Sequence, residues 1–213
     1  MPRVTCPACF RPIAYCYCSR LHAIANSWPV FILQDVREAG HPIGTARIAS
    51  LSLNQVEMVT LDPDRPDSAP DLLNNAFHRP LRNPALIYPG AGARQVSELG
   101  PDSAFTEVAQ GLRSDLLFID ADWGRSLRML KVFPALAALP TFMLDGLPIS
   151  RYRIRKQPTP DAVSTLEAIV HTLNQLEPEA GSSAMLSTMD WMIDQQIKRM
   201  GDNTFQHNYS ASP

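Results

Sequence analysis

Short apolar runs alternate along this chain with segments of helical periodicity, and this alternation constrains the fold more than any other feature. The clearest run is Asp115-Leu-Leu-Phe-Ile-Asp120, in which four apolar residues lie between two carboxylates. Continuous apolar runs of this length are typical of strands that are buried on both faces. Buried strands separated by helices predict an α/β fold with a parallel sheet, and such sheets bind ligands at the carboxyl ends of their strands.

The same periodicity predicts the other elements. Further apolar runs predict strands at residues 29–34, 56–61, 85–88 and 141–144. Helical spacing of apolar residues predicts helices at 45–53, 124–139, 164–176 and 184–200. Methionines recur along the last of these helices, and core packing explains them better than a partner or cofactor surface. Residues 62–84 contain five prolines and predict a long surface loop, with one helical turn near 72–77.

Composition is that of an ordinary globular protein. The chain has 213 residues, 45% of them apolar and 19% charged, which is enough for one sizeable core. No apolar run approaches the length of a membrane span, and residues 1–20 carry cysteines and arginines where a secretion signal needs an apolar stretch. We therefore expect a cytoplasmic protein with no membrane contact and no obligate protein partner. The expected parts are a knuckle at 1–22, a main domain at 23–200 and a flexible tail at 201–213.

All four cysteines of the chain lie close together near its start, at Cys6, Cys9, Cys16 and Cys18. Four thiolates at these spacings can enclose Zn²⁺ in a tetrahedron, with no open position for a substrate. This pattern predicts a small structural zinc knuckle that orders an N-terminus without a core of its own. The other interpretations are four reduced cysteines without metal, or a redox pair at Cys6 and Cys9. The redox pair is disfavoured because its usual strand-to-helix setting is absent.

Two predicted strand ends carry turn or polar residues. Tyr88-Pro89-Gly90 follows one strand, and Asp120-Ala121-Asp122-Trp123 follows another. Because ligands bind at the carboxyl ends of parallel strands, the fold argument alone points to these two loops. An ordinary turn is the alternative interpretation of Tyr88-Pro89-Gly90.

The short motifs of this chain, taken in order, resemble those of the DTW-domain proteins. The resemblance extends from residue 6 to about residue 175. The segments that carry it are Cys6-Pro-Ala-Cys9-Phe-Arg-Pro12, Cys16-Tyr-Cys18, Gln34…Arg37-Glu38, Thr45-Ala-Arg47, Ile87-Tyr88-Pro89, Ile119-Asp-Ala-Asp-Trp123 and Arg155…Pro158…Ser164-Thr-Leu-Glu-Ala168.

The resemblance implies a SPOUT-like α/β fold, in which a knotted set of loops at the strand ends holds S-adenosylmethionine. Bacterial members are tRNA-uridine aminocarboxypropyltransferases. The resemblance therefore implies transfer of the 3-amino-3-carboxypropyl group to N3 of a uridine in tRNA, which leaves methylthioadenosine. It implies that the catalytic residues are Asp120 and Trp123. The implied cofactor-binding residues are Tyr88, Pro89, Gly90, Asp120, Ala121, Trp123, Ser164, Thr165 and Glu167.

This sequence departs from the family's pattern in three places. The family's Asp-x-Thr-Trp is Asp120-Ala121-Asp122-Trp123 here, so that a carboxylate replaces the threonine. The His-Pro that usually follows the first strand's glutamine is replaced by Asp35-Val36. Gly44 stands where the next motif usually has asparagine, although His41-Pro42 lies nearby.

The polar residues of these motifs each admit a structural interpretation beside the functional one. Asp120 is the candidate base for the N3 proton, since burial would raise its pKa into a useful range, but it can also cap the following helix. For Asp122 we favour the cap over a tuning role. Trp123 can stack on a base or simply pack. Ser164-Thr-Leu-Glu167 is a capping box, and its helix N-terminus can also hold a carboxylate or phosphate.

Basic residues cluster locally although the formal net charge is −2. Four positive charges and no negative one occur between residues 151 and 156, which favours phosphate contact, with a solvated loop as the alternative. The predicted RNA-binding residues are Arg47, Arg125, Arg128, Arg151, Arg153, Arg155 and Lys156.

Two other functions compete with aminocarboxypropyl transfer. SPOUT-like folds usually expose the methyl carbon of the same co-substrate, which would make the chain an RNA methyltransferase. The departures from the family's pattern are also compatible with a zinc-bearing RNA-binding protein that has lost catalysis. The mass added to RNA separates the two enzymes, and affinity for S-adenosylmethionine separates both from the binding protein.

Overall fold

A single parallel β-sheet organises the chain in the computed structural model, which describes residues 4–66, 76–100, 113–155 and 162–210. Lys156, predicted to bind RNA, lies outside the described residues. The sheet has six strands in the order β2-β1-β5-β3-β6-β4, and every pair is parallel. The strands are β1 (Val30–Asp35), β2 (Val56–Leu61), β3 (Ala85–Ile87), β4 (Arg94–Gln95), β5 (Leu116–Asp120) and β6 (Thr141–Met143).

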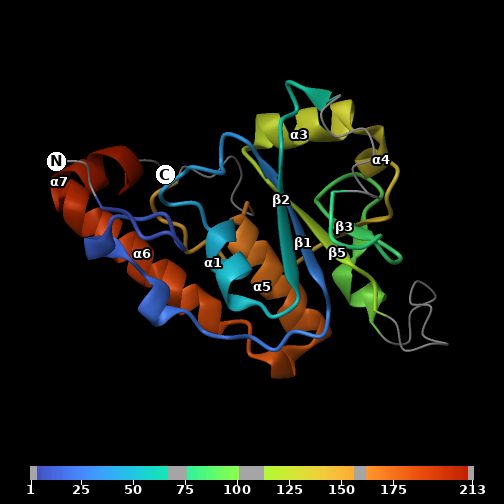
Figure 1. The fold of residues 1–213 in the computed structure, drawn as a ribbon, viewed down its shortest axis with the longest axis horizontal. Coiled ribbons are helices and arrows are strands. Elements are labelled where there is room, and N and C mark those ends of the chain that lie inside the picture. Colours follow the sequence, from blue (N-terminus) through green and yellow to red (C-terminus); the bar gives the residue numbers. More distant parts are fainter. Residues whose placement is uncertain (1–3, 67–75, 101–112, 156–161, 211–213) are drawn as a thin grey trace.

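Helices cover both faces of this sheet. Helices α1, α5 and α6 lie together on one side of it, and α3 and α4 lie on the other (Figure 1). The helices are α1 (Ala46–Ser52), α3 (Trp123–Val132), α4 (Pro134–Ala137), α5 (Thr165–Leu176), α6 (Ala184–Met200) and α7 (Asp202–Phe205). Short 3₁₀ turns occur at Ile13–Tyr15, Cys18–Arg20, Val96–Leu99 and Pro178–Ala180, and a π turn at Gln206–Ser210.

Alternate residues of each central strand enter different cores, because successive side chains of a strand point to opposite faces. Val30 and Ile32 of β1 belong to the larger cluster, which also contains residues of α1, α5 and α6. Phe31 and Leu33 belong to the smaller cluster, with Met129 of α3. The central strands are therefore buried on both faces, and this explains their continuous apolar runs.

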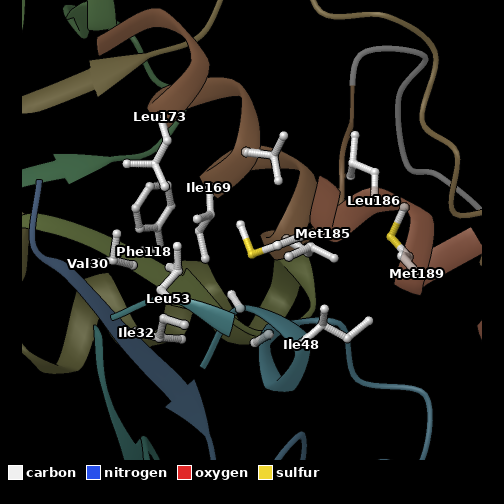
Figure 2. Packing of buried hydrophobic residues seen from close by; sticks show 14 of the residues in the cluster. Val30, Ile32, Ile48, Leu53, Phe118, Ile169, Leu173, Met185, Leu186 and Met189 are labelled. Atoms are coloured by element: carbon white, nitrogen blue, oxygen red, sulfur yellow. The ribbon is translucent and has the colours of Figure 1, made fainter. Parts of the chain in front are cut away.

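The larger core is filled mainly from α5 and α6. Ile169 and Leu173 of α5 pack beside Phe118 of β5, and methionines of α6 lie beside them (Figure 2). Met185 and Met189 are fully buried, so core packing accounts for the methionine stripe.

The predicted elements agree with the structure except at one proline and at one short strand. The single helix predicted at 124–139 is wrong, because the chain forms α3 and then α4, with Pro134 at the first position of α4. Proline lacks the N–H that a continuous helix would need there. Strand β4 was not predicted, since two residues carry no periodicity. The helical turn predicted near 72–77 falls largely outside the described residues.

No helix in the part of the chain that the structure describes is long and apolar enough to cross a membrane. The knot implied by the family resemblance stays a prediction, and so does the division into knuckle, main domain and tail. Cys6 and Cys9 belong to the larger core cluster, so the N-terminal segment packs on the main domain.

Truncating a buried residue of β5 tests this packing. Leu117 is fully buried between the sheet and α3, and Leu117→Ala should lower the free energy of unfolding by about 2–5 kcal/mol. Leu127→Ala is the matched control, because Leu127 of α3 is 58% exposed and its loss should leave stability almost unchanged. Urea denaturation of both variants measures the difference. Equal effects of the two substitutions would contradict the described burial.

Candidate functional site

A cavity of about 590 Å³ opens at the carboxyl ends of β3, β5 and β6. Its walls come from the loops that follow these strands and from the first turn of α5. Its lining is mostly apolar and includes Tyr88, Pro89, Ala121, Trp123, Leu144, Leu147, Arg155, Val163, Ser164 and Thr165. Gly90, Asp120 and Glu167, also predicted to bind the cofactor, are not part of this lining. The cavity therefore lies where the parallel-sheet argument places a ligand.

The two strand-end loops predicted to form the site meet in space. The rings of Tyr88 and Trp123 are in edge contact, with centroids 5.9 Å apart, and the Tyr88 hydroxyl lies 2.9 Å from Ser126 Oγ. Trp123 stays 38% exposed at the first position of α3. The Trp123 ring thus packs against Tyr88, while part of the residue remains exposed to solvent.

Asp120 ends the central strand β5 and is 7% exposed. Its Oδ2 accepts a hydrogen bond from Gln34 Nε2 of β1 at 2.8 Å, and its Oδ1 accepts one from the Thr165 hydroxyl of α5 at 2.7 Å. Burial raises the pKa of Asp120 although these two hydrogen bonds act in the opposite direction. The structure does not use Asp120 as a helix cap, the alternative role considered from sequence.

A second, smaller cavity of about 150 Å³ adjoins Asp120. It is polar, and its lining includes Glu38, His41, Thr45, Asp120, Tyr152 and Arg155. Arg155 lines both cavities, and Thr165 of the larger cavity donates to Asp120 of the smaller one. Asp120 therefore lies at the boundary between them.

Glu38, His41 and Tyr152 were not predicted as site residues. The family motif already included Glu38, and His41-Pro42 was noted, but no sequence signal joins them to Tyr152, more than 100 residues away.

Asp122 is the helix cap that we favoured from sequence. Its backbone is extended, and its Oδ1 accepts the Arg125 N–H at 2.8 Å. This hydrogen bond explains how a carboxylate can replace the family's threonine, because both supply a cap oxygen.

Arg125 lies in a buried ion-pair network and was predicted instead to contact RNA. Its guanidinium donates to both oxygens of Asp35, at 2.6 and 3.2 Å, and to Asp64 at 2.5 Å. Arg125 is 7% exposed and Asp35 only 1%. The guanidinium lowers the pKa of Asp64. With its donors held by carboxylates, Arg125 has a structural role at this position and little surface for a phosphate.

The first turn of α5 is the predicted capping box. Glu167 accepts the backbone N–H and the hydroxyl of Ser164, and it also accepts from Ser150 Oγ and the Arg151 N–H. Both carboxylate oxygens of Glu167 accept hydrogen bonds from the protein, and the residue is 1% exposed. It therefore fixes the loop before α5 rather than facing a ligand. Of the three predicted residues on this turn, Ser164 and Thr165 reach the cavity.

Four of the other predicted RNA-binding arginines are at least partly exposed but have partners within the protein. Arg151 and Arg153 form ion pairs with Asp190 and Asp194 of α6, and Arg128 pairs with Asp64. Arg47 donates to Ala8 O and lies over the ring of Phe10. These carboxylates reduce the positive field expected from the sequence, and RNA contact by these residues stays a prediction.

The four cysteines converge at the N-terminus. Their Sγ atoms all lie within 4.8 Å of one another, and two pairs, Cys6–Cys18 and Cys9–Cys16, are 3.7 Å apart. A tetrahedral zinc with Zn–S bonds of about 2.3 Å separates its sulfurs by about 3.8 Å. Without a metal, backbone hydrogen bonds lower the pKa of the Cys6 thiol to about 6, whereas the pKa of Cys16 is raised and burial raises that of Cys18. The donor set thus fits a closed four-sulfur metal site.

This cysteine knuckle also supports the smaller cavity. Buried Arg11 donates to Tyr15 O within the knuckle and to Pro42 O in the loop that carries His41. From the other side, the Tyr152 hydroxyl donates to Ile43 O of the same loop. The knuckle and Tyr152 therefore fix the position of one wall of the cavity.

The fold and the cavity define an α/β protein with a ligand site at the carboxyl ends of its parallel strands. The chain belongs to the DTW-domain family, since the family model described as the DTW domain matches residues 3–197. It is 30% identical over 181 residues to tRNA-uridine aminocarboxypropyltransferase 2 of Drosophila melanogaster. The matched region covers 82% of this chain and 67% of the relative. No solved structure matches the chain.

Removing Arg125 tests the buried network. Arg125→Ala leaves the Asp35 carboxylate buried without its cation, and we expect a loss of about 3–5 kcal/mol in the free energy of unfolding. Arg37→Ala is the matched control, because Arg37 pairs with the same Asp64 but at the exposed surface. Denaturant titration measures both. A stability of Arg125→Ala equal to that of the control would contradict the structural role.

Metal removal tests the knuckle. The purified chain should carry one metal ion, and Cys9→Ser should lose it, as measured by elemental analysis. Because Arg11 joins the knuckle to the loop around Pro42, metal loss should also speed amide hydrogen exchange in that loop. Exchange on the far side, in α3, should stay unchanged. A metal-free chain with wild-type exchange in both segments would contradict this account.

Proposed function

We propose that this chain transfers the 3-amino-3-carboxypropyl group of S-adenosylmethionine to N3 of a uridine in tRNA. The observation that carries the proposal is the position of Asp120, a buried carboxylate at the boundary between a nucleoside-sized cavity and a small polar one. The name of the fly relative supports the same reaction.

The larger cavity fits the nucleoside part of the co-substrate. Its volume of about 590 Å³ and its largely apolar lining are those of a small-molecule site. Tyr88 and Trp123 supply aromatic surface for adenine, and Ser164 and Thr165 supply polar groups at the end nearest Asp120. When S-adenosylmethionine is bound there, its sulfonium provides a leaving group that departs as a neutral thioether.

Asp120 is the proposed base. The uridine N3 forms a bond to the methylene carbon next to the sulfonium while the carbon–sulfur bond breaks and its electron pair stays on sulfur. The N3 proton passes to the Asp120 carboxylate, whose raised pKa makes it a better acceptor than a solvated aspartate. Gln34 and Thr165 hold both carboxylate oxygens and so fix the direction of proton transfer.

The acceptor enters over the exposed face of Trp123. This ring lines the cavity and remains partly open to solvent, so it offers a stacking surface for a base. Leu127 lies one turn further along α3 and is more exposed still, which extends this apolar rim.

Replacing Asp120 tests the proposal. Asp120→Asn keeps the shape but cannot accept the proton, and kcat/KM should fall by about 10²–10⁴-fold. In the wild type, kcat/KM should decline as the pH is lowered through the raised pKa of Asp120, because the protonated carboxyl is inactive. This acid limb should lie above the usual aspartate value of about 3.9 and be absent in the variant.

The assay is mass spectrometry of tRNA incubated with the enzyme and S-adenosylmethionine. The expected product gains an aminocarboxypropyl group, whereas a gained methyl group would identify a methyltransferase. Asp122→Thr is the matched control, because threonine keeps a cap oxygen for α3, and its activity should be retained. Full turnover by Asp120→Asn, with an unchanged pH profile, would remove Asp120 from the mechanism.

A further inference from the structure

The smaller cavity contains opposite charges that do not satisfy one another. Among the described residues, neither the Glu38 carboxylate nor the Arg155 guanidinium forms a hydrogen bond or ion pair, although both line this cavity of about 150 Å³. The other charged arginines of this loop behave differently, since Arg151 and Arg153 are each paired with a carboxylate of α6. Glu38 is half-buried and Arg155 is exposed, so water or a ligand supplies their partners.

One wall of this cavity is held at two points. Burial raises the pKa of Glu38, with the charge of Asp120 acting in the same direction and the charges of Arg155 and His41 acting against it. Tyr152 is 5% exposed and donates to Ile43 O, and Arg11 donates to Pro42 O, so the loop that carries Glu38 and His41 is fixed at two points. A cavity with one anchored wall and a separated anion and cation suits a ligand that carries both charges.

We propose that the smaller cavity binds the α-amino acid end of the co-substrate, with its carboxylate at Arg155 and its ammonium at Glu38. This inference rests on the proposed function and assigns the two ends of one ligand to two adjoining cavities. Arg155 lines both, so the arm passes from the nucleoside cavity beside this residue. The methylene that reacts then lies at the boundary, next to Asp120.

This assignment changes the role of Arg155, which the local run of basic residues predicts to contact RNA phosphate. It also supplies a reason for transferring the arm rather than the methyl group. Holding the carboxylate and the ammonium of the arm fixes the methylene carbon against the acceptor. Orientation of this kind lowers the activation free energy of the transfer.

Calorimetry with two ligands tests the inference. S-Adenosylmethionine carries the amino acid end, and methylthioadenosine has the same nucleoside without it. Glu38→Gln and Arg155→Ala should each bind S-adenosylmethionine about 10- to 100-fold more weakly than the wild type. Glu38→Gln should bind methylthioadenosine as the wild type does, because Glu38 does not line the larger cavity. Arg153→Ala, in the same loop but paired with Asp194, is the matched control and should bind both ligands normally.

The outcomes separate this inference from the proposed function. A wild type that binds neither ligand would overturn the proposed function and, with it, this assignment. A wild type that binds both, with unchanged S-adenosylmethionine affinity in Glu38→Gln and Arg155→Ala, would overturn the assignment alone. If those variants instead show a raised KM for tRNA at unchanged S-adenosylmethionine affinity, the smaller cavity receives the acceptor base, and the assignment is wrong.

Discussion

The two hydrogen bonds to Asp120 connect the fold of this protein to its site. A buried carboxylate needs donors to remain charged, and here one donor comes from β1 and the other from α5. The carboxylate thus links the central strand to its neighbour in the sheet and to the helix that covers them. Because β5 and α5 also contribute to the cavity walls, Asp120 lies where the sheet, the covering helix and the two cavities meet.

Arg125 contacts the residues at two of the departures from the family's pattern. Asp35, in place of the usual histidine, receives two hydrogen bonds from the Arg125 guanidinium. Asp122, in place of the usual threonine, accepts the backbone N–H of the same residue. Each substitution alone would add a negative charge near the strand ends. Arg125 neutralises the buried carboxylate of Asp35, and the N-terminus of α3 stabilises the carboxylate of Asp122. The site therefore keeps its geometry.

The sequence predicts those features whose physical cause is local. Apolar runs locate the central strands, the Ser164–Glu167 pattern marks the start of α5, and the cysteine spacing predicts the sulfur cluster. Features that depend on distant residues are missed. Arg151 and Arg153 look like a basic patch until α6 brings Asp190 and Asp194 beside them. The smaller cavity likewise joins Glu38 to Tyr152, which no periodicity connects.

A crystal structure of the complex with S-adenosylmethionine tests the central claim most directly. The quantity to measure is the distance from the Asp120 carboxylate to each carbon that is bonded to the sulfur. The account predicts the nucleoside in the larger cavity and the methylene of the amino acid arm nearest Asp120, leaving room for an acceptor nitrogen at about 3–3.5 Å from that carbon. A complex with the methyl carbon in that place, or with the nucleoside outside the larger cavity, would contradict it.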